Sequence, residues 1–174
     1  STHETSPTPD GDYEIIGCTF DQCGNDNIFS GGAIYYASKQ HDRNIKIANC
    51  SFNSNSALQG GTIHIDASIG NIENCIFKDN LAIEGSDISI VYPKIESENS
   101  DGFIKIQYCS FYFTLSENAD IIDSFVKIDW GNNAKFDFNN NIITASCSTS
   151  IGFLGFENKD DSFPNPTSET MLFD

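Results

Sequence analysis

The sequence predicts an all-β solenoid, a parallel β-helix of about five coils, and three observations lead to it. The chain of 174 residues is rich in Ile and holds 14 Phe, which favour strands, while abundant Asn and Ser with 13 Gly favour turns. Two short motifs alternate along the chain five times, which is typical of repeat architectures. Apolar residues within these motifs alternate with a period of two, the spacing of a β-strand.

The first motif is built around a column that is cysteine in four of the five repeats. The column consists of Cys18, Cys50, Cys75, Cys109 and Asn141. Three positions earlier stand Ile15, Ile47, Ile72, Ile106 and Phe138. Two positions later stand Phe20, Phe52, Phe77, Phe111 and Ile143. Both flanking positions are apolar in every repeat, so we expect the first motif to form one strand of each coil and the two positions to form two buried ladders.

The second motif follows the first and begins with a glycine pair in its clearest copies. It reads GGAIYY at 31–36, GGTIHI at 60–65 and GSDISI at 85–90, with weaker copies at 123–128 and 151–156. The repeats are 32, 25, 34 and 32 residues long, so short strands of fixed length are joined by variable loops. Strands joined in the same order in every repeat stack in parallel and leave the loops outside.

The cysteines are interpreted mainly as small, buried apolar residues. Cys50, Cys75 and Cys109 are expected to be free thiols, because neighbouring stacked strands give poor disulfide geometry. Cys18 and Cys23 are the better candidates for a disulfide.

Polar and glycine residues between the strands are expected to form turns. Asn55 and Asn80 are predicted to adopt positive φ and to hydrogen-bond neighbouring coils. Gly60 and Gly61 would let the chain turn sharply into the second motif.

The two motifs resemble the FxxN and GGA(I/L/V) repeats of the chlamydial polymorphic outer-membrane proteins, and similar repeats occur on some protist surfaces. FxxN stands at 52–55 and 77–80, and GGAI stands at 31–34 with a near copy at 60–63. The resemblance covers roughly 13–156. It implies a right-handed parallel β-helix on an exported, surface-displayed protein, commonly an adhesin.

The domain organisation follows from composition. Residues 1–12 are predicted to be a linker or mobile lead-in, 13–156 the parallel β-helix, and 157–174 a capping tail or a linker to a following domain. We also expect the chain to be a module of a longer protein or a larger assembly.

The charge of the chain restricts its partners. Nine Lys and Arg stand against 25 Asp and Glu, a net charge of −16, which argues against nucleic acid and anionic lipid. No apolar run is long enough to span a membrane. We expect an extracellular or cell-surface location and a protein or glycan partner at a cell surface, with no nucleic-acid contact.

No catalytic, metal or cofactor site is predicted, so the chain is expected not to be an enzyme. His41, Asp42 and Arg43 form a polar cluster that is interpreted as a solvated loop, and His64 is expected to point outward as an exposed residue. The carboxylates that could in principle hold calcium are interpreted as surface charge: Glu96, Glu98, Asp101, Asp120, Asp123 and Asp129. A carbohydrate-active β-helix enzyme or a purely structural assembly subunit remains the alternative function.

Binding is expected on loops or on one sheet face. The loops at 39–44 and 92–102 both leave between the second motif of one repeat and the first motif of the next. Insertions at one point of a repeat emerge on one side of a solenoid, so we expect both loops on the same flank. Their acidic and mixed charge favours a basic or polar partner.

Overall fold

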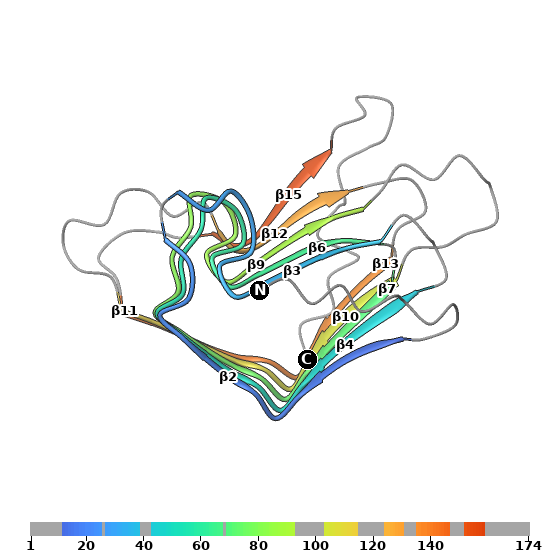
Figure 1. Cartoon of the computed structure of the whole chain (residues 1–174), viewed down its shortest axis with the longest axis horizontal. Coiled ribbons are helices and arrows are strands. Elements are labelled where there is room, and N and C mark those ends of the chain that lie inside the picture. The colour runs from blue at the N-terminus through green and yellow to red at the C-terminus, as the bar shows by residue number, and fades with distance from the viewer. Residues whose placement is uncertain are drawn as a thin grey trace, which may run out of the picture.

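The chain is an all-β protein in the part that its computed structural model describes, where no helix occurs. Fifteen strands, β1 to β15, form three parallel sheets of five strands each. The described residues are 12–25, 27–38, 43–67, 69–92, 103–114, 124–130, 135–146 and 152–158. Figure 1 shows two sheets meeting at a sharp corner and the third lying across from them.

Each sheet takes every third strand along the chain. The first sheet has the order β1 (Tyr13–Ile16), β4 (Asn44–Ala48), β7 (Ile69–Glu73), β10 (Phe103–Gln107) and β13 (Lys135–Asn139). The second sheet has the order β2 (Thr19–Asp21), β5 (Ser51–Asn53), β8 (Ile76–Lys78), β11 (Ser110–Thr114) and β14 (Ile142–Ser146). The third sheet has the order β3 (Ile34–Ala37), β6 (Ile63–Asp66), β9 (Ile88–Val91), β12 (Ser124–Trp130) and β15 (Gly152–Asn158).

The strand register confirms the repeat alignment read from the sequence. Ile15, Ile47, Ile72, Ile106 and Phe138 pair in turn across the first sheet. Phe20, Phe52, Phe77, Phe111 and Ile143 do so across the second. Each repeat therefore supplies one rung, meaning three consecutive strands, one to each sheet.

The first motif forms two strands, whereas the sequence predicted one. The chain bends at the residue before the cysteine column, where Gly17, Asn49, Asn74, Tyr108 and Asn140 all have positive φ between 51° and 67°. The two apolar columns are five residues apart, an odd spacing that would place them on opposite faces of a continuous strand. Because both columns point inward, a bend between them is required.

Phenylalanines stack along the core at close to the strand spacing. The ring centroids of Phe52 and Phe77 lie 5.0 Å apart, and those of Phe77 and Phe111 lie 4.8 Å apart, with the rings nearly parallel. All three are fully buried, as are Ile47, Ile72 and Ile106. The expectation of two buried ladders is confirmed for these rungs, while Ile143 at the last rung is 42% exposed.

Asparagines form a polar ladder inside the fold, in addition to the two apolar ladders. The Asn55 Nδ2 and backbone N–H groups both donate to Asn80 Oδ1, at 3.0 and 2.9 Å, and Asn80 Nδ2 donates to the Phe52 carbonyl. The predicted bonds between rungs are therefore confirmed, but the predicted positive φ is wrong. Ser54 and Asp79, one position earlier, make the left-handed turn, and this leaves the asparagine side chains facing inward.

The cysteines in the described residues are free thiols, including Cys18 and Cys23. Cys50, Cys75 and Cys109 are buried, as expected, and each Sγ donates to the backbone carbonyl two residues earlier. Burial raises the pKa of the Cys50 thiol above its ordinary value. These thiols are therefore part of the core packing.

Glycine shapes the turn into the third sheet, as predicted. Gly60 has a φ of 56°, a conformation that side chains disfavour. A Cβ at Gly61 would collide with the carbonyl oxygens of Leu81 and Ser86 in the neighbouring rung. Adjacent rungs approach too closely there for any side chain.

Within the described ranges, the structure has no helix of the length and apolarity that a membrane span needs.

Candidate functional site

The outer face of the third sheet carries a groove of about 470 Å³. The side chains of Ile34, Ile63 and Ile88 point into the core, so the residues that alternate with them point outward. The groove is lined by Ile28, Phe29, Ser30, Tyr35, Gln59, His64, Val91 and Asp129. Residues from four rungs thus contribute to one site.

A loop of the first repeat forms one wall of the groove. The gap between the cysteine column and the glycine pair is three residues longer here than in the second and third repeats, and residues 28–30 belong to this longer connection. The Leu58 and Gln59 N–H groups donate to the carbonyls of Ile28 and Phe29 at 2.8 and 3.0 Å. The wall is therefore attached to the next rung by backbone hydrogen bonds.

Two aromatic side chains are exposed at the groove. Tyr35 is 59% exposed, and its ring stacks on His64 with a centroid distance of 5.3 Å and an interplanar angle of 5°. Phe29 is 69% exposed. Stacking on His64 therefore fixes the orientation of the Tyr35 ring, and both Tyr35 and Phe29 offer apolar surface to a ligand.

The prediction that His64 is an exposed surface residue is wrong, because only 5% of its surface is accessible. Its outward orientation on β6 is as expected, but neighbouring rungs cover it. Tyr35 stacks on it from β3, and Ser89, which is itself buried, is its register partner on β9. Strand alternation gives the direction of a side chain and does not report what the adjacent rungs place beside it.

Polar side chains also form a ladder beside the groove, separate from the asparagine ladder inside the fold. Ser30, Gln59 and Glu84 occupy equivalent places in three successive rungs. Ser30 Oγ donates to Gln59 Oε1 at 3.4 Å, and Gln59 Nε2 donates to Glu84 Oε2 at 3.0 Å. The amide of Gln59 is thus oriented by both neighbours, and the third described member of the ladder is a carboxylate.

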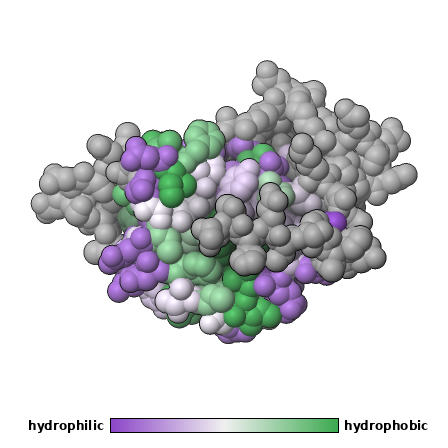
Figure 2. All heavy atoms as spheres, in the orientation of Figure 1, coloured by the Kyte–Doolittle hydropathy of each residue, from purple (hydrophilic) through white to green (hydrophobic). Residues whose placement is uncertain are grey.

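An apolar ridge runs next to this polar ladder. It consists of Phe29, Leu58 and Ile83, the residues directly before Ser30, Gln59 and Glu84. Ile83 is 63% exposed and Leu58 is half-buried. In Figure 2, hydrophobic surface lies beside hydrophilic surface over the turns that join the second and third sheets. A ligand at the groove can therefore contact apolar and polar groups together.

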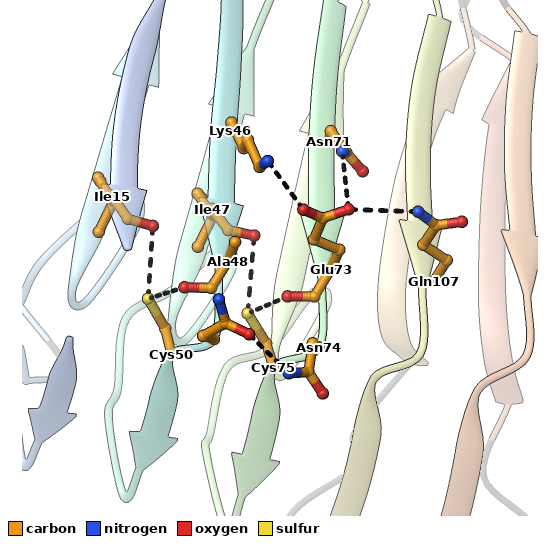
Figure 3. A network of polar contacts seen from close by, with 11 residues as sticks. Ile15, Lys46, Ile47, Ala48, Cys50, Asn71, Glu73, Asn74, Cys75 and Gln107 are labelled. Atoms are coloured by element: carbon orange, nitrogen blue, oxygen red, sulfur yellow. Dashed lines mark hydrogen bonds and ion pairs between the residues drawn. The ribbon is translucent and has the colours of Figure 1, made fainter. Parts of the chain in front are cut away.

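The outer face of the first sheet has a different character. Lys46 Nζ lies 3.0 Å from Glu73 Oε1, while Asn71 and Gln107 donate to Glu73 Oε2, so three strands converge on one carboxylate (Figure 3). The hydrogen bond from Lys46 holds the pKa of Glu73 below its ordinary value. These polar groups bind one another, and this face is therefore a weaker candidate for a site.

Most of the polar residues singled out in the sequence lie outside the described residues. This applies to His41, Asp42, Glu96, Glu98, Asp101, Asp120 and Asp123, and to the loop segments 39–42 and 93–102. Arg43 is described, and its Nη1 donates to the Tyr13 hydroxyl at 3.5 Å. Asp129 lines the groove. In the part of the chain that is described, no group of three or more His, Cys, Asp or Glu could hold a metal ion.

Sequence reasoning did not find the groove. One signal was available: the first repeat has a three-residue insertion directly before a strand whose outward position is the aromatic Tyr35. An insertion beside an outward aromatic residue indicates a wall next to a stacking surface.

Comparisons with known proteins give no relative for this chain: no family model, no curated protein and no solved structure matches it.

Proposed function

We propose that the three sheets are the faces of a right-handed parallel β-helix, and that the module serves non-enzymatic recognition at a cell surface or outside the cell. The groove carries the proposal, because it places exposed aromatic residues on a rigid stacked scaffold. The resemblance of the motifs at 31–34, 52–55, 60–63 and 77–80 to the polymorphic outer-membrane protein repeats supports a surface location and an adhesive role.

A carbohydrate-active enzyme is the alternative function, and one observation favours it. His64 and Asp129 both line the groove, and they could serve as acid and base. Glycoside hydrolysis ordinarily uses two carboxyl groups that flank the scissile bond. Asp129 is the one carboxylate among the described lining residues, so the geometry favours binding over catalysis.

Two experiments test the proposed function. Antibodies against the chain should label intact, non-permeabilised cells of the source organism, and labelling that requires permeabilisation would contradict the surface location. Neutral and acidic polysaccharides incubated with the purified protein should release no new reducing ends. Turnover that is lost in Asp129→Asn or His64→Gln would refute the non-enzymatic proposal and establish the alternative.

A further inference from the structure

We propose that the groove binds cationic side chains of a partner protein, with the apolar ridge holding neighbouring apolar residues of the same segment. This inference rests on the proposed recognition function and names the ligand chemistry of its site. The partner is thus a basic, amphipathic stretch of polypeptide. Three features of the groove lead to this assignment.

The first feature is charge complementarity. The chain has a net charge of −16, which attracts cations over long distances and speeds their encounter. Within the groove Asp129 supplies a carboxylate, and Glu84 adds a second one in the polar ladder beside the groove. The positively charged Lys127 points outward from the third sheet like His64, and it lies two rungs further along the sheet. It is not among the residues that line the groove. The local charge of the groove thus agrees with the charge of the whole chain.

The second feature is the aromatic surface. A Lys ammonium or Arg guanidinium is attracted to the face of an aromatic ring within about 6 Å of its centroid. Tyr35 is held flat on His64 and keeps 59% of its surface exposed, so the ring is oriented before a ligand arrives. Phe29 on the loop wall provides a second ring at the same groove.

The third feature is the ridge of Phe29, Leu58 and Ile83. A neutral sugar would contact only the aromatic surface. A peptide with alternating basic and apolar residues would contact the groove and the ridge at the same time. The ridge follows successive rungs, so its residues are spaced at about 4.8 Å, within reach of neighbouring side chains of an extended peptide.

The test is fluorescence anisotropy of the whole chain with a fluorescein-labelled nonapeptide made of three Gly-Leu-Lys repeats. The matched probe carries Nε-acetyllysine at every lysine, which removes the charge and keeps the length. We expect the acetylated probe to bind at least about tenfold more weakly, since the Asp129 carboxylate and the two aromatic rings, which lie three rungs apart, act on different lysines of the probe. Asp129→Asn and Tyr35→Ala should each weaken binding of the cationic probe by about fivefold or more.

Two control variants separate the groove from the general negative charge. Asp21→Asn removes an exposed carboxylate from β2, and Tyr112→Ala removes an exposed aromatic ring from β11, both on the second sheet. We expect each to change affinity by less than about twofold. Circular dichroism checks folding, and Phe29→Ser on the exposed loop replaces Tyr35→Ala if that variant does not fold.

Several results would overturn the inference. One is equal loss in Asp129→Asn and Asp21→Asn, which would assign binding to net charge alone. Equal affinity for the cationic and the acetylated probe would also overturn the inference, and so would the absence of binding of either probe. Maltohexaose or chitohexaose bound in a Tyr35-dependent manner, without peptide binding, would overturn the cationic ligand and leave the recognition function standing. Cleavage of those sugars would instead refute the recognition function itself.

Discussion

Replacing Asp87 with Asn is expected to stabilise the protein at neutral pH and to remove part of the dependence of stability on pH. Asp87 lies at the third position of the 85–90 motif, where the equivalent residues are Ala33 and Thr62. Its side chain is 3% exposed, and Asn80 Nδ2 donates to its Oδ1 at 2.8 Å. Burial, opposed by this hydrogen bond, raises the pKa of Asp87 from 3.8 to about 7.

The sign of the effect follows from this raised pKa. Between pH 4 and 7 the folded protein binds a proton at Asp87 that the unfolded chain has released, so stability falls as pH rises through this range. The stability that proton binding at Asp87 contributes is fully present below the pKa of Asp87 in the unfolded chain, and it is lost above the pKa of Asp87 in the folded protein. The interval from 3.8 to about 7 corresponds to about 4 kcal/mol of unfolding free energy, an upper bound.

The variant should recover only part of this free energy. Asn keeps the oxygen that accepts from Asn80, but it adds N–H donors at a buried position, at a cost of about 1–3 kcal/mol if they find no acceptor. We therefore expect Asp87→Asn to be more stable than the natural protein by about 1–3 kcal/mol at pH 8 and not more stable at pH 4.

Urea unfolding followed by circular dichroism at pH 4, 5, 6, 7 and 8 measures this difference. The exposed Asp21→Asn variant serves as the control for loss of one negative charge, because self-repulsion of an acidic chain also lowers stability at high pH. The reasoning would be refuted if the difference between Asp87→Asn and the natural protein did not grow with pH, or if Asp21→Asn showed the same growth.

Three further predictions concern the core, a turn and a loop. Phe77→Ala should lower the unfolding free energy by about 3–5 kcal/mol in urea titration, because a cavity opens between two stacked rings, and a loss below 1 kcal/mol would contradict the ladder. Gly61→Ala should cost at least about 2 kcal/mol because its Cβ meets backbone carbonyls of the next rung, and an unchanged urea midpoint would show that the turn can relax. Deleting 94–101 should leave the circular dichroism spectrum unchanged and weaken binding to the cognate surface; unchanged binding would exclude that loop.

The sequence predicted the apolar columns well because each is repeated at one position in every rung. Stacking requires like shapes above one another, so the column of Phe52 and the column of Ile47 were visible as patterns. The bend at Asn49 was not predicted as a change of sheet, although the odd spacing of the two columns requires one.

Features that depend on contacts between rungs were harder to predict from the sequence. The burial of His64 comes from side chains on neighbouring strands, and the left-handed turn falls at Ser54, where it directs the side chain of the next residue inward. The groove depends on how an insertion folds over another rung, which no local pattern in one repeat specifies. Asp129 was noted in the sequence only as surface charge, and its place in the groove required the register of the third sheet.

The stacking of one rung on the next also determines how the module would respond to mechanical force. Hydrogen bonds of all three sheets, the asparagine ladder and the stacked rings all join rung to rung, so a pull on the chain ends would open one interface at a time. Each released rung would lengthen the chain by one repeat of 25 to 34 residues, or about 85–115 Å. In single-molecule stretching this gives a staircase of extensions, and one simultaneous rupture would contradict it. Such a module would lengthen under load while its remaining rungs keep their structure.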